Sequence, residues 1–359
     1  MLKYLFFAIS PLFLFSETAF SSEKIREIAS RSSIPLIQVA YSEGKRVSLY
    51  EVATADGVME REDCSTVFQA ASLSKPLFAY IVVKMAERGE IDLDAPLVRY
   101  ADADRFDNWG YASLLTARIV LSHRSGLPNW ALSPGSADWP ASKISFRFRP
   151  DSAFSYSGEA YAYLQRAVEN IRGRGLEEIA REEVFIPLGM SSTSYIWLDR
   201  YDSLASSGYT REGVNRGVGS FPRANSAYTL RTTAGDYIKF LSAITEGVGI
   251  GKRASRELFT PVINAVRYPE RPRECDNTIF WGLGVGIEKN RELGDIVFHW
   301  GDNGNFKALF IIVPKGRGKP KRILVYFTNS AAGHDVINDM AILFLGNKEP
   351  LAIHDWVLK

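Results

Sequence analysis

The stretch of sequence that decides the fold is TVFQAASLSKPLFAYIVVKMAER, residues 66–88. It opens with a short apolar run at residues 67–71 that predicts a strand. It continues over residues 76–88 as a largely apolar helix, which Gly89 ends. Ser72 and Lys75 lie at the junction, in the spacing S-x-x-K. A serine and a lysine at the start of a buried helix make this junction the first candidate for chemistry.

Two interpretations of the Ser72–Lys75 pair stay open on local sequence. Residues three apart on a helix share a face, so the Lys75 amine can reach the Ser72 hydroxyl. Unpaired N–H groups at a helix start favour negative charge on a serine oxygen, and burial would lower the pKa of the lysine until it acts as a neutral base. The same residues also fit an N-cap serine followed by a surface lysine. Pro76 in addition disfavours helical geometry at Lys75.

Two other S-x-x-K matches offer no pocket. Residues 21–24 lie at a predicted cleavage site, and residues 42–45 lie in a predicted hairpin turn. Ser42 remains a weaker alternative nucleophile for this reason. A bare S-x-x-K pattern therefore carries little information without its apolar surroundings.

Outward from this segment, strands are predicted at both ends of the chain and helices between them. Such an order predicts an α+β fold, with an antiparallel sheet flanked by helices and an inserted, mainly helical lobe. We expect one domain over residues 22–359, with a sheet lobe from about 22–90 and 245–359 and a helical lobe from about 91–244. A cleft between the lobes is the expected place for a small-molecule site. The predicted strands are residues 36–41, 46–52, 280–287, 296–300, 306–313 and 323–328, and the predicted helices are residues 23–30, 76–88, 116–122, 160–170, 175–184, 233–244 and 335–345.

Composition argues against several classes of protein. The chain has 359 residues, 46% of them hydrophobic, and 43 basic against 41 acidic side chains give a formal net charge of +2. Without a run of like charge, no nucleic-acid partner is expected. Four histidines without HExxH spacing and two cysteines without CxxC predict no metal site, and no cofactor is expected.

Residues 1–21 predict a signal peptide. Lys3 precedes the apolar run at residues 5–15, and small residues follow up to a cleavage point after Ser21. The alternative is an uncleaved anchor, but the run is short and interrupted, below the ~20 residues of a spanning helix. The expected location is therefore secreted or periplasmic, with no stable membrane span after cleavage. In an oxidising compartment, Cys64 and Cys275 fit either a disulfide or two separate thiols.

Residues 66–75 resemble the nucleophile segment of β-lactamase-related serine hydrolases. That group includes class C β-lactamases, penicillin-binding D,D-peptidases, D-aminopeptidases and related carboxylesterases. The resemblance runs from about residue 30 to residue 345 and implies a β-lactamase/transpeptidase-like fold. The further matching segments, in order, are IDLDAPLVRY (91–100), LSHRSGLP (121–128), FSYSG (154–158), PLGM (187–190), LRTTAGD (230–236) and HWG (299–301).

The resemblance implies a set of roles at one site. Ser72 attacks an acyl carbon and forms an acyl-enzyme. Lys75 and Tyr156 share the role of general base, and Tyr156 passes a proton to the leaving group. The backbone N–H groups of Ser72 and Asp302 form the oxyanion hole, and His299 orients Tyr156 or meets a polar substrate group. Substrate is expected at Gly158, Trp300 and Gly301, whereas His123 is interpreted as structural, and the glycines at positions 282, 284 and 286 are interpreted as part of a strand that binds no nucleotide.

Two departures from the lactamase pattern bear on the substrate. Gly158 stands where lactamases carry an asparagine, and His299 and Trp300 stand where they carry lysine and threonine. Losing these polar partners weakens substrates that depend on them by ~10²-fold or more. The sequence thus predicts an esterase, amidase or peptidase for small acyl or D-amino-acid substrates, including short peptides of cell-wall origin, and Trp300 is expected to favour an apolar acyl group. The alternatives are a class C-like β-lactamase and a non-catalytic module that binds penicillin or peptidoglycan.

Overall fold

The computed structural model describes residues 11–221, 223–316 and 318–358. The first ten residues of the predicted signal peptide therefore lie outside the described residues. Helix α1 (Pro11–Arg31) continues without a break through the predicted cleavage point after Ser21, and the signal peptide stays a prediction. Within the described part of the chain, none of the helices combines the length and the apolarity that crossing a membrane requires.

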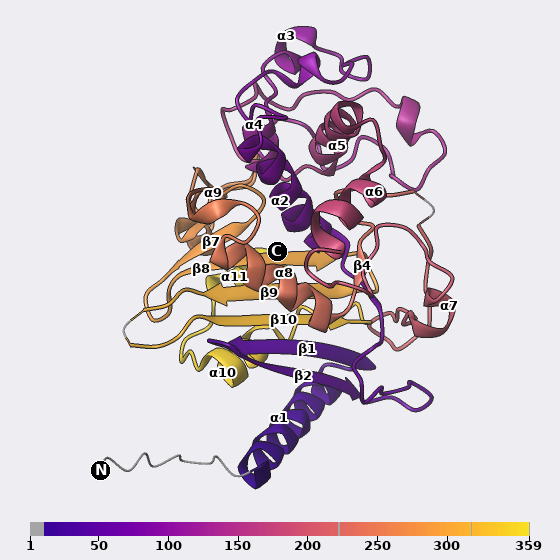
Figure 1. Cartoon of the computed structure of the whole chain (residues 1–359), viewed down its shortest axis with the longest axis vertical. Coiled ribbons are helices and arrows are strands. Elements are labelled where there is room, and N and C mark those ends of the chain that lie inside the picture. The colour runs from indigo at the N-terminus through magenta and orange to yellow at the C-terminus, as the bar shows by residue number, and fades with distance from the viewer. Residues whose placement is uncertain (1–10, 222, 317, 359) are drawn as a thin grey trace, which may run out of the picture.

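One antiparallel sheet of eight strands forms the centre of the fold, in the order β2-β1-β10-β9-β8-β7-β6-β5. Strands from both ends of the chain meet in it, because β1 pairs with β10. Figure 1 shows the helical lobe above this sheet, with α1 and α10 below. The predicted α+β fold is confirmed. The strands are β1 (Leu36–Glu43), β2 (Arg46–Ala53), β5 (Ile263–Asn264), β6 (Ile279–Trp281), β7 (Gly286–Asn290), β8 (Gly294–Asp302), β9 (Lys307–Val313) and β10 (Arg322–Thr328).

The central part of the sheet is buried on both faces, which explains why the middle residues of its central strands are mostly apolar. In β9, Leu309 and Ile311 face a core shared with α1, α10 (Ile337–Leu345) and α11 (Ala352–Leu358). Phe310 and Ile312 face the opposite core, shared with α2 (Ser74–Glu87) and α8 (Ala234–Glu246). This alternation follows from the two-residue period of a strand. Burying each large apolar side chain contributes about 1.5–3 kcal/mol to this arrangement.

Two predicted strands differ from the structure. Residues 280–287 form two short strands instead of one, because Gly282 and Val285 close a turn between β6 and β7 through a 2.9 Å hydrogen bond. In that turn, a Cβ on Gly284 (φ +83°) would lie 2.4 Å from the Cβ of Ala79, so the turn packs tightly against α2. The run at 67–71 contributes only β3 (Phe68–Gln69), which pairs with β4 (Arg231–Thr232) outside the main sheet.

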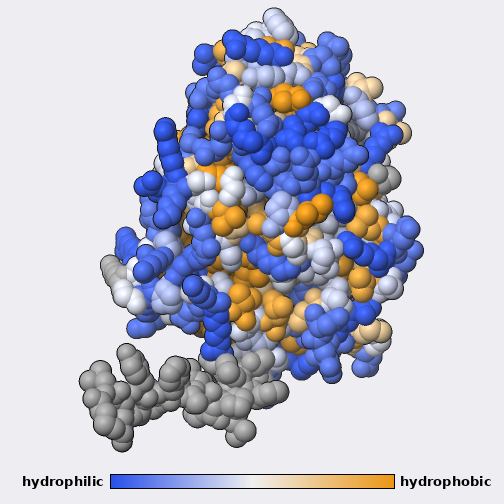
Figure 2. Space-filling view, viewed as in Figure 1, coloured by the Kyte–Doolittle hydropathy of each residue, from blue (hydrophilic) through white to orange (hydrophobic). Residues whose placement is uncertain are grey.

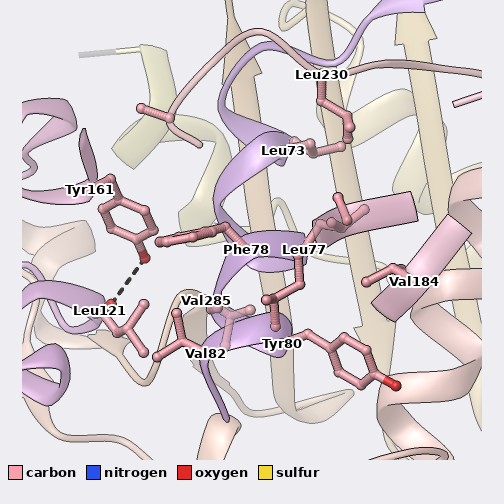
Figure 3. Packing of buried hydrophobic residues seen from close by; sticks show 14 of the residues in the cluster. Leu73, Leu77, Phe78, Tyr80, Val82, Leu121, Tyr161, Val184, Leu230 and Val285 are labelled. Carbon is pink, nitrogen blue, oxygen red and sulfur yellow. Dashed lines mark hydrogen bonds between the residues drawn. The ribbon is translucent and has the colours of Figure 1, made fainter. Parts of the chain in front are cut away.

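Helix α2 (Ser74–Glu87) runs from the sheet into the helical lobe and is buried along most of its length. Figure 3 shows Phe78 and Val82 of this helix pointing toward Tyr161 and Leu121, which are joined by a 3.3 Å hydrogen bond from the tyrosine hydroxyl to the leucine carbonyl. Pro76 falls in the first helical turn, where a backbone N–H has no intrahelical partner to lose. Lys75 itself lies within α2, so it adopts the helical geometry that the following proline disfavours.

The remaining helices lie above the sheet, beside it or across its front in Figure 1. The predicted boundaries of the two lobes stay a prediction. Most of α8 falls within the segment predicted as the helical lobe, and this helix lies against β1 and β10 of the sheet. On the face seen in Figure 2, the surface over the helical lobe is mostly hydrophilic, and hydrophobic residues are more frequent across the middle and lower part. These helices are α3 (Trp109–Ala112), α4 (Ala117–Leu121), α5 (Gly158–Arg172), α6 (Leu176–Ala180), the π-helical η4 (Arg181–Phe185), α7 (Tyr201–Leu204), α8 (Ala234–Glu246) and α9 (Gly251–Leu258).

The two cysteines are present as thiols. Cys64 precedes β3, and Cys275 lies in the 3-10 turn η5 (Glu274–Asn277) before β6. Of the two alternatives left open by the sequence, the structure contains the separate thiols. Burial raises the pKa of Cys64 to about 11, which makes its thiolate scarce at neutral pH.

A buried carboxylate ties α2, α5 and η4 together, and removing its charge is expected to destabilise the helical lobe. Glu183 accepts hydrogen bonds from Arg88 and Arg172 at 2.8 Å and pairs with Lys84 at 3.0 Å. Burial alone would raise the pKa of Glu183, but these three cations outweigh it and hold the pKa at about 2. Glu183→Gln removes the carboxylate that the three cations share and leaves only Glu90 and Glu182 to pair with the arginines. We therefore expect the free energy of unfolding to fall by about 3 kcal/mol in urea denaturation.

The same variant should change the pH dependence of stability. Because the pKa of Glu183 is lower in the folded state, its contribution is present above the unfolded value near 4.5 and is lost as the pH falls toward 2. Wild type and Glu183→Gln should therefore converge in stability as the pH is lowered through this window. The exposed Glu178→Gln serves as the control, expected within ±0.5 kcal/mol of wild type. An equal loss in both variants would contradict the assignment.

Candidate active site

Ser72 lies in a short 3-10 turn, η1 (Ala71–Leu73), directly before α2. Its neighbours Ala71 and Leu73 are fully buried, while Ser72 is partly exposed and lines a cavity of about 1280 Å³. Ala71 adopts a left-handed backbone with φ of 48°. Such a conformation is unfavourable for a residue with a Cβ and is common where a side chain must be presented to a site. The turn therefore exposes one hydroxyl from an otherwise buried segment.

Lys75 is buried beside this hydroxyl. Its Nζ donates a hydrogen bond to Ser72 Oγ at 3.1 Å and another to the Ala227 carbonyl at 2.8 Å. Only 1% of the residue is exposed, and burial lowers the pKa of the Lys75 amine well below 10.5. The predicted i, i+3 contact is confirmed, and the alternative of a surface lysine is wrong. Burial therefore makes the Lys75 amine lose its proton more readily than an ordinary lysine, next to a serine hydroxyl.

Tyr156 converges on the same pair from the segment that precedes α5. Its ring centre lies 4.7 Å from Lys75 Nζ. The Tyr156 hydroxyl is buried and makes no hydrogen bond to a described residue. Burial raises the pKa of the Tyr156 phenol, and the nearby hydroxyl of Ser72 opposes this only in part. The phenol is therefore protonated in the resting site, which leaves the Lys75 amine as the stronger base.

His299 projects from β8 toward the same group. It is fully buried, and burial, together with the nearby Lys75, lowers the pKa of its imidazole well below 6.5. Its Nδ1 lies 2.7 Å from the Trp300 carbonyl, so in the neutral ring Nδ1 carries the proton and Nε2 is an acceptor. Nε2 is buried without a partner among the described residues, and the ring centre is 6.2 Å from that of Tyr156. His299 thus offers one unused acceptor near the phenol.

His123 is a residue at this site whose position the sequence did not reveal. Its ring centre lies 4.2 Å from that of Tyr156, closer than His299. Its Nδ1 accepts a hydrogen bond from the Ser157 N–H at 3.1 Å, so Nε2 carries the proton. The backbone of His123 is left-handed, with φ of 55°. The sequence predicts a structural role for His123, and it does not predict that the ring packs against the Tyr156 phenol. The motif LSHRSGLP, which contains His123, is the sequence feature that could have indicated this position.

The Asp302 N–H is available to face Ser72 because of the register of the β8–β9 hairpin. Asn303 N donates to Phe306 O at 3.1 Å, which makes these two residues a hydrogen-bonded pair across β8 and β9. Hydrogen-bonded and non-bonded pairs alternate in an antiparallel ladder, so the next pair, Asp302 and Lys307, is non-bonded. The Asp302 N–H then points away from β9. Its carboxylate is held by the Gly304 N–H at 2.8 Å and by Lys307 at 2.5 Å, which fixes the hairpin.

Gly301 allows β8 to approach the Ser72 turn, and adding one methyl group should separate them. A Cβ at this position would lie 2.4 Å from the Ala70 carbonyl oxygen, a backbone atom that cannot move aside cheaply. We expect Gly301→Ala to lower kcat/KM for an ester substrate by about 10²-fold, because a displacement near 1 Å has that effect. Gly175→Ala, which meets nothing within 4 Å, is the matched control. Full activity of Gly301→Ala, with the control behaving as wild type, would show that this contact does not position the site.

The three residues predicted to bind substrate lie differently from expectation. Gly301 is buried against Ala70, and neither it, Gly158 nor Trp300 lines the cavity. Trp300 packs at 4.9 Å ring separation against both Tyr156 and Trp356. Trp300 therefore does not line this cavity, and its contact with a substrate stays a prediction. The Trp130 indole occupies the space that a side chain at position 158 would need. A Cβ on Gly158 would lie 2.4 Å from this indole.

Ser72 and Lys75 line the cavity between the helical lobe and the sheet, and the Tyr156 ring packs against Lys75 behind them. This arrangement defines a protein of the β-lactamase/transpeptidase-like class. The chain belongs to the Beta-lactamase family, whose sequence model matches residues 22–346. The family predicted from the seven sequence segments is confirmed. Among the described residues, no cluster of His, Cys, Asp and Glu side chains could hold a metal ion.

Individual relatives include penicillin-binding proteins and an esterase. Penicillin-binding protein 4* of Bacillus subtilis is 24% identical over 322 residues, 78% of this chain and 64% of that protein. Esterase EstB of Burkholderia gladioli is 31% identical over 160 residues, 38% of this chain and 40% of the esterase. The chain thus spans less than two thirds of either relative. The D-stereospecific amidohydrolase from a Streptomyces species shares the fold, with a TM-score of 0.73 at 18% identity over 92% of this chain and 99% of that one.

Proposed function

We propose that this chain is an exported serine hydrolase that forms an acyl-enzyme on Ser72 and cleaves a small ester, amide or D-amino-acid peptide. The observation that carries the proposal is the 3.1 Å contact between the Ser72 hydroxyl and a Lys75 amine whose pKa burial lowers. A neutral amine at this distance can accept the proton of the attacking hydroxyl. A serine without such a base is a poor nucleophile at neutral pH.

Acylation follows from the positions of three side chains. The Lys75 amine takes the proton from Ser72 Oγ while that oxygen attacks the carbonyl carbon of the substrate. The negative charge on the carbonyl oxygen is met by the N–H groups of Ser72 and Asp302, and each such donor contributes about 10²–10³ in rate. The bond to the leaving group then breaks. The Tyr156 hydroxyl gives the leaving group its proton and is reprotonated by the Lys75 ammonium.

Deacylation reverses the proton movements with water as the nucleophile. Lys75, neutral again, accepts a proton from a water molecule that attacks the acyl carbon. Ser72 leaves and recovers its proton, which regenerates the resting site. Within this scheme, His123 and His299 are positioning residues, because both pack near Tyr156 and both have an imidazole that burial keeps neutral. Their buried, uncharged rings stabilise a phenol without competing as bases.

The substrate class depends on which leaving group and which acyl group the site accepts. The relatives' names combine penicillin binding and ester hydrolysis. The family's asparagine is replaced by Gly158 and its space is taken by Trp130, which removes a side-chain amide that suits a β-lactam or a peptide carbonyl. This favours ester and small amide substrates over β-lactams. A class C-like β-lactamase is the alternative enzyme, and a non-catalytic penicillin- or peptidoglycan-binding module is the alternative of another class.

The test compares three substrates on one preparation of the mature chain. We expect p-nitrophenyl butyrate to be hydrolysed with a kcat/KM well above that of nitrocefin, with a D-alanyl-D-alanine peptide as the third substrate. A fluorophosphonate probe should add one adduct mass to the wild-type chain. Strong nitrocefin turnover without esterase activity would contradict the preference. Penicillin binding without turnover of any of the three substrates would identify a binding module.

A further inference from the structure

We propose that Arg267 is a positioning residue that acts through Tyr156: its guanidinium supplies the fixed positive charge that stabilises the phenolate formed when Tyr156 gives its proton to the leaving group. This inference rests on the proposed function and names its substrate class as alkyl esters and amides, whose leaving groups are strongly basic and need that proton. Arg267 does not line the cavity that contains Ser72, so it acts on the substrate only through another side chain.

The backbone brings Arg267 to the segment that carries the phenol. Residue 267 forms a parallel bridge with Phe154, and the Tyr268 N–H donates a hydrogen bond to the Phe154 carbonyl at 2.9 Å. Tyr156 lies two residues further along the same segment. The two segments are distant in sequence, since one follows β5 and the other precedes α5. Their pairing places a cationic side chain beside the tyrosine motif.

Two tryptophan rings hold the guanidinium of Arg267. Its central carbon lies 4.0 Å from the ring centre of Trp356 and 5.9 Å from that of Trp300, and its Nη2 donates to the Trp356 carbonyl at 2.8 Å. A cation within about 6 Å of a tryptophan face is attracted by the ring. The Trp300 ring in turn packs against the Tyr156 ring at 4.9 Å. Trp300 therefore contacts both the guanidinium and the phenol, which keeps these two groups near each other.

The other titratable groups that face Tyr156 favour their uncharged forms. They come from four elements: Lys75 from α2, His123 from the turn after α4, His299 from β8 and Tyr161 from α5. Burial lowers the pKa of the lysine and of both histidines well below their usual values. Burial also raises the pKa of the Tyr161 phenol. None of these four groups is suited to hold a permanent positive charge beside the phenol.

Arg267 is suited to hold that charge. Burial, followed by the nearby Arg273, lowers the pKa of Arg267, but an arginine keeps its proton at neutral pH. Among the described residues, no carboxylate lies within ion-pair distance of Arg267. Glu270 and Asp276 act on it only at longer range, and Asp276 pairs with Arg273 at 3.3 Å. The charge is therefore incompletely compensated, and its field lowers the pKa of the Tyr156 phenol against the opposing effect of burial.

The charge matters at one step of acylation. When the bond between the acyl carbon and the leaving atom breaks, its electron pair goes to the leaving atom, which takes the proton of the Tyr156 hydroxyl. Tyr156 is then a phenolate until the Lys75 ammonium returns a proton to it. A buried anion is costly without a compensating charge, so a nearby guanidinium lowers the barrier to this proton transfer. A p-nitrophenolate leaves as a stable anion without a proton, whereas an alkoxide or an amine does not.

Two esters with the same acyl group and different leaving groups test the inference. Arg267→Gln should lower kcat/KM for ethyl butyrate, followed by pH-stat, about tenfold, because an opposite charge changes a neighbouring pKa by about one unit or more. It should change kcat/KM for p-nitrophenyl butyrate by less than about twofold. Arg267→Lys keeps a cation that can lie over the tryptophan rings and should retain ethyl butyrate hydrolysis within about threefold of wild type. The matched control is Arg271→Gln, an exposed arginine of the same loop, which should keep both wild-type values.

A second neutral variant guards against simple misfolding. Arg267→Met keeps an apolar chain against the Trp356 ring and removes only the charge and its hydrogen bond. It should show the same selective loss on ethyl butyrate as Arg267→Gln. The p-nitrophenyl ester, measured on each preparation beside the thermal unfolding midpoint, reports whether the site is intact. Equal losses on both esters in both neutral variants would make Arg267 a merely structural residue and overturn the inference.

The outcomes separate this inference from the proposed function. If Ser72→Ala keeps wild-type hydrolysis of both esters, the proposed function fails. If hydrolysis depends on Ser72 but the ratio of the two kcat/KM values is the same in Arg267→Gln and wild type, only the role of Arg267 is wrong. A loss on ethyl butyrate in Arg267→Lys as large as that in Arg267→Gln would also overturn it, since the positive charge would then not be the cause.

Discussion

Replacing Ser72 by alanine is expected to lower kcat for ester hydrolysis by on the order of 10⁶-fold, to a rate set by binding and the oxyanion hole alone. The reason is chemical, because no other described hydroxyl combines exposure to the cavity with a 3.1 Å contact to a buried amine. The substitution removes one oxygen from a partly exposed residue, so the fold should be unaffected. Stopped-flow and steady-state kinetics on p-nitrophenyl butyrate, beside thermal unfolding, measure both quantities.

Ser42→Ala provides the matched control for this experiment. Ser42 belongs to another S-x-x-K match, but it lies in β1, where it is 2% exposed, and its side chain does not line the cavity. It should retain wild-type kinetics. A loss in Ser42→Ala with full activity in Ser72→Ala would transfer the nucleophile to the hairpin and refute the account.

Lys75→Met is expected to abolish hydrolysis nearly as completely and yet to stabilise the fold. Removing the base should cost about as much as removing the serine, since the two act as a unit. Burial lowers the pKa of Lys75 in the folded state, so the unfolded chain binds more protons and stability is reduced below pH ~10. An apolar side chain of similar shape removes this cost. Urea denaturation at pH 7 should show a gain of about 1–2 kcal/mol.

The control for this prediction is a lysine at the surface. Lys252→Met in α9 alters an exposed residue and should change neither kcat nor stability by a measurable amount. The pH dependence adds a second check, because the gain from Lys75→Met should shrink as the pH rises toward the unfolded pKa of lysine. A Lys75→Met variant that is both active and destabilised would contradict the assignment of a buried neutral base.

The central sheet and the Ser72–Lys75 contact could be predicted because both follow from local periodicity. Residues 306–313 and 323–328 are predominantly apolar, and they correspond to β9 and β10, which are buried on both faces. Ser72 and Lys75 are three residues apart at the start of an apolar helix, and the geometry of a helix alone brings them together. Such contacts depend on spacing along one segment and require no knowledge of the tertiary fold.

The walls of the cavity could not be predicted because they depend on contacts between distant segments. Trp130 occupies the space over Gly158 from a different loop, and nothing in either local sequence indicates that approach. Trp300 follows His299, a predicted catalytic residue, but successive residues of a strand point to opposite faces of the sheet. The Trp300 ring packs against Trp356 and does not line the cavity. Likewise, Gly282 and Gly284 form a turn that packs against Ala79 of α2, where the sequence predicts a continuous strand. Tertiary packing, rather than propensity, determined each of these positions.

The most direct measurement is to trap the covalent intermediate and locate it. Wild-type chain mixed rapidly with p-nitrophenyl hexanoate and quenched in acid should gain the mass of one hexanoyl group in intact-mass spectrometry. Peptide sequencing should place that group on Ser72. An acyl group on another residue, or substrate turnover by a chain that never gains mass under conditions in which a known acyl-enzyme is detected, would contradict the account.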